Sequence, residues 1–384
     1  MAENSKKTLA FGILSLSLLT IMAGAAVSPA LADIQKSLNV ASPTLVKMIL
    51  TLPAVFIIPT SYIVGKYAGI ISKKKLALLG VLIYVSAGCG AVFADGIYFL
   101  LATRAVLGVA VGIIMPLAAS LIADFFEGED RMRMMGYNAA FANFGGILAT
   151  FSSGLLASIN WRYSFFVYGL GIPVFFIALM FIRDKKRETT GTAQPKKKLP
   201  KETYFAAFPV FLVFLGFYTI PTNIAAYLIS KDLGGPPEAG YAMAMATGTA
   251  MLMGLFTVKI RNVLGRAFIP AIAFTMLLTH ALLGFTSSIL TVNLALISNG
   301  FTLSMSVAYV MHRATETSRG HNVGATSLVT VLIFLGQFFS PLVMDFLGGI
   351  FGMYSPAFSF QAVSAGALAA FIFTLLQSFR QPRH

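Results

Sequence analysis

The sequence consists largely of apolar runs of about 20 residues, each long enough to cross a lipid bilayer as one α-helix. Inside a bilayer every backbone N–H and C=O group must be bonded within the protein, which helices achieve by themselves. Charged residues make up 11% of the chain, whereas soluble domains contain about a quarter, so the chain cannot cover a water-facing surface. We therefore predict an all-α membrane protein with twelve transmembrane helices, at residues 8–31, 45–67, 76–94, 97–122, 134–159, 162–182, 204–229, 240–259, 267–286, 290–311, 323–345 and 355–378.

The first apolar run has a second interpretation. Lys6 and Lys7 precede it and Ala30-Leu31-Ala32 ends it, an arrangement that also suits a cleaved signal peptide. The run is longer than the apolar region of a usual signal peptide, which favours an uncleaved first helix.

Lysine and arginine are distributed unevenly between the predicted loops. If the N-terminus is cytoplasmic, 23 of the 28 basic residues lie in cytoplasmic segments, four lie outside, and Arg104 lies within a span. Basic loops mark the cytoplasmic side, so the sequence predicts a multi-pass protein of the plasma (inner) membrane with both termini in the cytoplasm. Loops next to anionic lipid then explain the net charge of +14, and we predict no nucleic-acid partner.

One long polar segment divides the predicted spans six and six. Residues 183–203 are basic and are interrupted by Pro195 and Pro200, as expected of a cytoplasmic linker. The linker separates an N-terminal six-helix bundle, 1–182, from a C-terminal one, 204–384. Parallel halves of this kind are typical of transporters.

Four short stretches have recognisable spacings and lie at matching depths in the predicted spans. They are SPALADI at 28–34, GKYAGIISKKK at 65–75, RAVLGVAVG at 104–112 and NWRYSFF at 160–166. In this order they resemble motifs of the major facilitator superfamily, and the chain is most similar to its twelve-span drug efflux (drug/proton antiporter) branch. The resemblance implies two pseudo-symmetric six-helix bundles that work by rocker-switch alternating access.

Two parts of the chain depart from the family pattern. Gly69 and Ile70 stand where the family's loop motif has an acid and an arginine. Ala149-Thr150 replaces the glycine–proline pair expected in the fifth span. The resemblance therefore implies the fold more directly than it implies proton antiport.

Arg104 is the sharpest single candidate for a transport role. If the fourth span begins near Ile97, Arg104 lies roughly 10 Å along it at about 1.5 Å per residue. A charge at that depth usually faces a wet cavity or a partner, which favours a substrate or proton-relay site, as the resemblance also implies. The alternative is a structural arginine bonded to backbone carbonyls of a neighbouring helix.

Carboxylates are absent from the middle of the predicted spans. Asp33, at an outer helix end, is the best remaining proton-coupling residue, acting with Arg104 across the outer cavity. A solvated helix-end charge is the alternative for Asp33. An arginine without an acid favours an anionic or neutral amphipathic substrate over a cationic one.

Spans one, four, seven and ten line the cavity in the family that the sequence resembles. Aromatic and polar side chains on these spans suit an organic substrate, although helix packing is the alternative for each of them. The predicted substrate-binding residues are Arg104, Thr20, Phe214, Phe217, Tyr218, Asn223, Asn299 and Tyr309. His280 lies near the middle of the ninth span, where it is a candidate proton group. That span is peripheral in the family, which favours the alternative of a hydrogen-bonded structural histidine.

The stretch GKYAGIISKKK also suggests a gate. The lysines that follow its motif can reach Asp124, at the cytoplasmic end of the fourth span, within the same half of the chain. Because the usual acid and arginine are missing, such a contact would replace the family's latch and give a looser inner gate. We predict that Gly65, Lys73, Lys74 and Asp124 take part in gating.

Together these features predict a secondary active transporter that exports a small amphipathic organic compound, coupled to protons, as a monomer in the lipid bilayer. One alternative is an organic-anion importer or exchanger centred on Arg104, and another is a transport-dead membrane receptor or scaffold. The sequence has no nucleophile–base constellation and no Cys or His cluster with metal-ligand spacing. We therefore predict no enzyme activity, no metal site and no cofactor.

Overall fold

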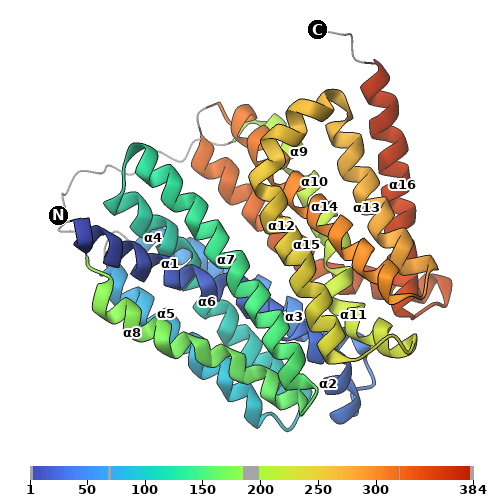
Figure 1. Cartoon of the computed structure of the whole chain (residues 1–384), viewed down its shortest axis with the longest axis horizontal. Coiled ribbons are helices and arrows are strands. Elements are labelled where there is room, and N and C mark those ends of the chain that lie inside the picture. Colours follow the sequence, from blue (N-terminus) through green and yellow to red (C-terminus); the bar gives the residue numbers. More distant parts are fainter. Residues whose placement is uncertain (1–2, 68–70, 185–198, 320, 381–384) are drawn as a thin grey trace. The chain divides into compact units, whose positions relative to one another are not determined.

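A computed structural model describes residues 3–67, 71–184, 199–319 and 321–380, which form α-helices and short 3₁₀ helices and no strand (Figure 1). The chain divides into two compact units, Met1–Lys198 (unit 1) and Leu199–His384 (unit 2). Gly69, Ile70 and most of the predicted linker lie outside the described residues.

Unit 1 is built from long helices with short 3₁₀ turns at their ends. In chain order these are α1 (Glu3–Ala25), η1 (Ser28–Ala30), α2 (Leu31–Ser37), α3 (Pro43–Thr51), α4 (Pro53–Tyr67), α5 (Lys73–Gly90), η2 (Ala91–Phe93), α6 (Ile97–Phe125), α7 (Gly128–Ala157), η3 (Trp161–Leu170) and α8 (Gly171–Phe181). Unit 2 contains α9 (Lys201–Ala207), α10 (Pro209–Phe217), α11 (Thr219–Ser230), α12 (Pro236–Leu264), η4 (Gly265–Ala267), α13 (Phe268–Phe285), α14 (Ile289–Thr317), α15 (Asn322–Phe351) and α16 (Pro356–Arg380).

Eleven helical segments of the described chain are long and apolar enough to cross a membrane. One of them, Pro236–Phe285, has 50 residues and comprises α12 and α13. A bilayer core of about 30 Å needs only about 20 residues, so this segment is long enough for the predicted eighth and ninth spans. The predicted all-α membrane fold is confirmed, and the count of twelve depends on taking α12 and α13 as separate spans.

Several helices differ from the predicted spans in their ends or their continuity. α7 begins at Gly128 rather than at 134, and α14 continues to Thr317 rather than to 311. Polar residues extend both helices beyond the apolar run, which a hydropathy criterion cannot detect. The second and seventh spans are each broken, with Pro53 and Pro221 in the first turn of the following helix, where a missing N–H is least costly.

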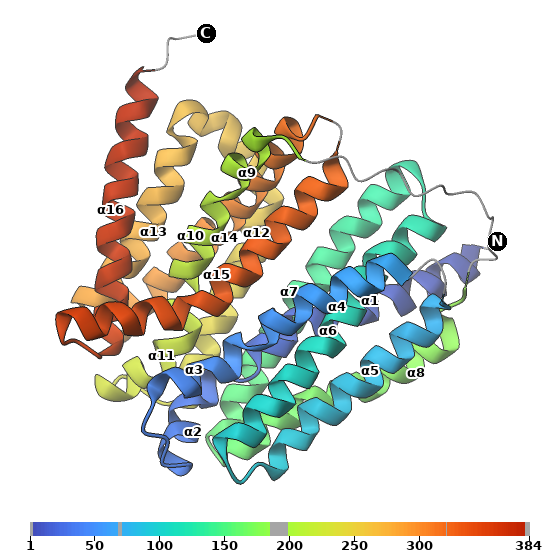
Figure 2. The ribbon, with the colours of Figure 1, turned by 180° about the vertical axis from the view of Figure 1, so that it is seen from behind.

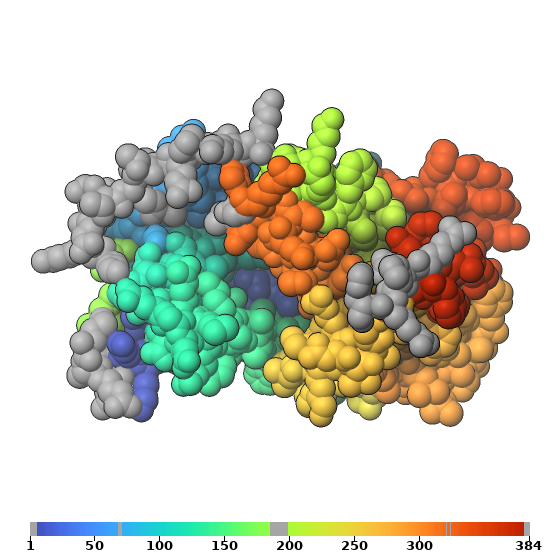
Figure 3. Space-filling model, turned by 90° about the horizontal axis from the view of Figure 1, so that it is seen from above, coloured from blue at the N-terminus to red at the C-terminus, as the bar shows by residue number. Residues whose placement is uncertain are grey.

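Both units use the same set of helix pairs. In unit 1, α1 packs on α7, α4 on α6, and α5 on α8. In unit 2 the corresponding pairs are α10 with α15, α12 with α14, and α13 with α16. Figure 2 shows α5 beside α8 in unit 1, and Figure 3 shows the end of unit 2 where α12 (yellow) and α14 (orange) lie side by side. Each unit is therefore a repeat of one packing arrangement.

Glycines allow the first and fifth spans of each unit to approach at backbone distance. A Cβ atom at Gly145 of α7 would collide with the carbonyl oxygen of Leu18 on α1, and one at Gly336 of α15 would lie 2.6 Å from the carbonyl oxygen of Phe211 on α10. Small residues at such crossings are typical of membrane helices, whose association depends on close packing. Leu18 and Phe211 therefore occupy equivalent positions in the two units.

Serine hydroxyls fix the register of the same two helix pairs. Ser153 donates to the carbonyl of Ala26, and Ser340 donates to the carbonyl of Leu215 over 2.7 Å. Ser153 follows Gly145 by eight residues, and Ala26 follows Leu18 by the same number. Likewise Ser340 follows Gly336 by four residues, and Leu215 follows Phe211 by four. The two helices of each pair therefore run parallel. The bonds also satisfy hydroxyl groups that have no access to water.

We expect Gly145→Ala to lower the free energy of unfolding by about 1–3 kcal/mol, because the added methyl group must push two backbones apart. Gly136→Ala is a matched control on the same helix, since a Cβ there meets no atom within 4 Å. This control should leave stability unchanged or raise it by up to about 1 kcal/mol through helix propensity. Thermal unfolding of the detergent-solubilised protein measures both effects, and equal midpoints for the two variants would contradict the packing argument.

Candidate functional site

Arg104 lies in the interior of unit 1. It belongs to α6 and is 0% exposed. Its Nη1 donates to the hydroxyl of Tyr168 over 2.8 Å, and its Nη2 donates to the carbonyl oxygen of Ala87 over 3.3 Å. The rings of Phe165 and Tyr168 lie 5.1 and 5.0 Å from the guanidinium carbon, so aromatic faces as well as oxygen atoms stabilise the charge.

Tyr168 connects Arg104 to the first helix. Its hydroxyl donates to the carbonyl oxygen of Ala23 over 2.8 Å, near the C-terminal end of α1. A Cβ at Gly88 of α5 would collide with the Tyr168 ring, so a glycine is required there to make room for it. Arg104 thus links α6 and α5 directly, and reaches α1 through Tyr168.

Two polar atoms in this cluster have no hydrogen-bond partner within the described part of the chain. They are Nε of Arg104 and the hydroxyl of Tyr84, and the Tyr84 ring lies 5.5 Å from that of Tyr168. Unpartnered buried polar groups are costly and are often found at functional sites. In this conformation Arg104 is bonded within the protein, as expected of a structural arginine. Its role in substrate binding stays a prediction.

Asp33 and Thr20 lie apart from the Arg104 cluster. Asp33 is half-buried in the first turn of α2, and within the described residues it forms no ion pair with Arg104. Thr20 is half-buried and donates to the carbonyl oxygen of Ser17 on its own helix. The predicted pairing of Asp33 with Arg104 is therefore not seen among the described residues in this conformation. The proton-coupling role of Asp33 stays a prediction.

The contact predicted between the basic loop and the fourth span is present. Nζ of Lys73 lies 2.5 Å from a carboxylate oxygen of Asp124 and 2.7 Å from the hydroxyl of Ser120. The pair is mostly shielded, with side-chain exposures of 19% and 28%. Gly65, near the end of α4, is exposed. The Lys73–Asp124 contact is confirmed, and gating by these residues remains a prediction.

Asp184 is a partner that the sequence analysis missed. Its carboxylate accepts from the hydroxyl of Ser72 over 2.5 Å and from the backbone N–H of Lys74 over 3.1 Å. A carboxylate at a helix N-terminus is favourable because of the helix dipole, and α5 begins at Lys73. Nζ of Lys74 donates to the carbonyl oxygen of Leu179 on α8 over 2.6 Å. An acid directly after the sixth span, in the region of a basic loop, is the sequence signal that could have predicted this bond.

In unit 2 the structure brings four of the predicted substrate-binding residues together at one hydrophobic core. Phe214 is buried, and Phe217, Tyr218 and Tyr309 pack against the same core. The rings of Phe217 and Tyr218 are 5.2 Å apart and edge-to-face. For these residues, helix packing is therefore observed directly.

The two predicted asparagines differ in how they are bonded. Asn223, which is 4% exposed, donates to the carbonyl oxygen of Thr219 one turn earlier on α11. Asn299 on α14 is 2% exposed, and its Nδ2 has no partner within the described residues. Asn299 therefore retains an unused donor, which Asn223 does not.

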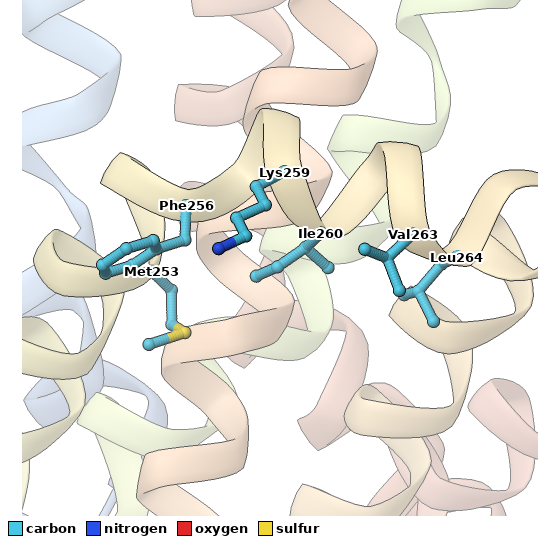
Figure 4. Close-up of a pocket in the computed structure, with 6 residues that line it drawn as sticks. All are labelled: Met253, Phe256, Lys259, Ile260, Val263 and Leu264. Atoms are coloured by element: carbon cyan, nitrogen blue, oxygen red, sulfur yellow. The ribbon is translucent and has the colours of Figure 1, made fainter.

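A shallow hollow of about 390 Å³ lies along the C-terminal half of α12 (Figure 4). Its lining is apolar apart from one ammonium group, and consists of Met253, Phe256, Lys259, Ile260, Val263 and Leu264. Lys259 is the last residue of the predicted eighth span, whereas α12 continues to Leu264, so Lys259 lies within the helix. The correction has the same cause as the others, because α12 continues past the apolar run.

We expect Tyr168→Phe to lower the free energy of unfolding by about 1–3 kcal/mol, since it removes the hydroxyl that bonds both Nη1 of Arg104 and the Ala23 carbonyl. Tyr84→Phe is the matched control, because it removes a neighbouring buried hydroxyl that has no protein partner and should be neutral or stabilising. Thermal unfolding in detergent compares the two variants. Equal destabilisation by both would refute the assigned role of the Tyr168 bridge.

Comparison with known proteins relates this architecture to transporters. The Quinolone resistance protein NorA of Staphylococcus aureus (strain MSSA476) is 25% identical over 336 residues, which cover 82% of each chain. The Multidrug transporter protein MdtP of Bacillus subtilis (strain 168) is 24% identical over 180 residues, or 46% of this chain and 30% of the relative.

Solved structures agree in fold. A bacterial homolog of the human lysosomal transporter Spinster matches with a TM-score of 0.77 at 15% identity, covering 98% of both chains. The nucleoside transporter NupG matches with a TM-score of 0.73 at 12% identity, over 97% of this chain and 100% of that one. The family model of the Major Facilitator Superfamily matches residues 13–341. With most of its length matched by that model, the chain belongs to the Major Facilitator Superfamily and is a multi-pass secondary transporter rather than an enzyme.

Proposed function

We propose that this transporter exports small amphipathic organic compounds from the cytoplasm in exchange for protons, by rocker-switch alternating access of its two units. The similarity to a quinolone resistance protein over 82% of both chains carries this proposal. The shorter similarity to a multidrug transporter points to the same substrate class. We further propose that the chain acts as a monomer in the plasma membrane with both termini in the cytoplasm.

In this proposal the buried groups of unit 1 act during the transport cycle. Arg104 is a permanent cation whose bonds are all to neutral oxygen atoms, so a change in the α1–α6 contact can expose it to a substrate or to the carboxylate of the proton carrier. Asp33 is the proposed proton carrier near the outer end of the first span. Lys73 and Asp124 hold α5 to α6 at the cytoplasmic end and regulate the inner gate.

The unit 2 residues proposed to contact substrate are of two kinds. Phe214, Phe217, Tyr218 and Tyr309 offer aromatic surface, which binds planar organic molecules without a charge requirement. Asn223 and Asn299 of unit 2 add polar groups, as does Thr20 of unit 1. Among them Asn299 has the unused Nδ2 donor and is the best candidate to orient a substrate.

Uptake into proteoliposomes with an acidic lumen tests the proposal. We expect ethidium to accumulate several-fold over protein-free vesicles, because protons leaving the lumen drive the dye inward. This expectation rests on the similarity to a drug exporter, whereas the charge of Arg104 by itself favours anionic or neutral substrates, so uptake of a cation would show that Arg104 does not set the charge preference. Ethidium is permanently charged, so it is not trapped by protonation as a weak base would be. Uptake equal to that of empty vesicles, or uptake that survives collapse of the pH gradient by nigericin, would contradict proton-coupled export.

In the same assay, protein variants test the proposed residues and a second dye separates the alternative functions. Arg104→Ala should abolish uptake, and Lys73→Gln should change the rate more than Lys75→Gln, an exposed lysine of the same loop. Size-exclusion chromatography shows whether each variant is folded. Transport of carboxyfluorescein in place of ethidium would favour the organic-anion exchanger, and no transport of any probe would favour the receptor.

A further inference from the structure

His280 is a buried titratable group that the transport scheme above does not use. It lies on α13 in unit 2 and is 1% exposed. Its Nδ1 is 2.9 Å from the carbonyl oxygen of Met276, one turn earlier on the same helix. Its Nε2 is 3.2 Å from the carbonyl oxygen of Gly216 and 3.3 Å from the hydroxyl of Thr219. Both ring nitrogens therefore face carbonyl oxygens.

This geometry fits two protonation states of the ring. A carbonyl oxygen only accepts, and a neutral imidazole has one N–H, so a neutral ring can bond only one of the two carbonyls. The hydroxyl of Thr219 resolves the difference, because it can donate either to Nε2 or to the Gly216 carbonyl, from which it is 2.7 Å away. In the neutral ring Thr219 donates to Nε2, and in the imidazolium Nε2–H donates to Gly216 instead.

The groups around His280 are neutral. From α16 the ring of Phe360 lies 6.4 Å away, and Tyr227 of α11 packs on Phe360 with its hydroxyl bonded to the Thr286 carbonyl. From α14 the facing groups near Thr275 are hydroxyls, of which Thr302 is one. In the described chain no carboxylate pairs with His280.

The elements that pack against α13 carry the basic residues Arg266 of η4, Lys259 and Arg261 of α12, and His312 and Arg313 of α14. Arg266 of η4 precedes α13 and lies 14 residues before His280, about 20 Å along a helix. The charge of a proton at His280 would therefore be stabilised by the carbonyl dipoles of Met276 and Gly216, since no ion pair involves His280 in the described residues.

The Gly216 carbonyl that faces His280 lies at a helix break and is equivalent to a bonded carbonyl in unit 1. Gly216 lies at the end of α10, directly before the break that separates α10 from α11. It lies five residues after Phe211, just as Ala23 lies five residues after Leu18, and Phe211 and Leu18 are equivalent. In unit 1 the Ala23 carbonyl is bonded to Tyr168, which Arg104 holds. Both units thus connect a basic side chain to the same carbonyl of their first span.

We propose that His280 is a proton-binding site of unit 2, at which proton uptake transfers the Thr219 hydroxyl from Nε2 to the Gly216 carbonyl and so changes the bonding at the α10–α11 break. The proposal rests on the proposed proton coupling for its role in transport. Its chemistry does not depend on transport, because it requires only that the ring exchange one proton with the surroundings.

Nitrogen NMR of the imidazole ring tests this site directly. The chain has four histidines, so the triple variant His312→Gln, His321→Gln and His384→Gln leaves His280 as the only signal. With ¹⁵N-labelled histidine in lipid nanodiscs, we expect a titration between pH 5 and 8.5 from the imidazolium to the neutral ring protonated at Nδ1. A ring that stays neutral with unchanged shifts over this range would overturn the proposal.

Thr219→Val checks the hydroxyl transfer. It removes the hydroxyl that faces Nε2 in the described structure, so at the midpoint pH of the parent protein we expect about fivefold more imidazolium relative to neutral ring. Thr222→Val is the control, because Thr222 is on the same helix and donates to the Tyr218 carbonyl rather than to the ring. Equal titrations in both variants would overturn the assigned role of Thr219.

Transport then separates the two proposals. If His280 couples protons to transport, His280→Gln should flatten the pH dependence of ethidium uptake, and an unchanged pH dependence would overturn that coupling. If the wild-type protein moves no probe, the proposed function fails, whereas the NMR titration alone decides whether His280 binds a proton.

Discussion

Close backbone contact between the first and fifth spans of each unit is the constraint on which both buried basic sites depend. Gly145 and Gly336 allow α7 and α15 to lie against the carbonyls of Leu18 and Phe211, and the resulting register is repeated in both units. That register positions the equivalent carbonyls of Ala23 and Gly216, each near the end of a helix. Without these glycines the first span would move away from the helices that supply its hydrogen-bond donors.

The two units use different side chains at this shared position. In unit 1 Tyr168 donates to the carbonyl and is held by Arg104, which is charged at any physiological pH. In unit 2 the hydroxyl of Thr219 and Nε2 of His280 both lie within hydrogen-bond distance of the carbonyl, and in our proposal His280 becomes its donor when the ring takes up a proton. The repeat is therefore symmetric in packing and asymmetric in chemistry, with a fixed charge in one unit and a titratable group in the other.

Much of the fold followed from the sequence, because hydropathy reports burial in lipid directly. The Lys73–Asp124 contact was also predictable, since a basic run without acids needed a partner and Asp124 was the nearest one. The Arg104–Tyr168 bridge was not, because the sixth span offers many aromatic residues and nothing in one sequence pairs a tyrosine with a distant arginine. The same limit applied to His280, whose partners are backbone carbonyls that no residue type marks.

If substrate and proton exchange for one another, each must weaken the binding of the other by the same factor. The most direct measurement is the pH change when a saturating amount of ethidium is added to purified protein in weakly buffered detergent solution. Binding is followed in parallel by fluorescence. Exchange predicts that protons are released as the dye binds, and that less dye binds at lower pH. Dye binding without proton release at any pH between 5 and 8.5 would contradict it.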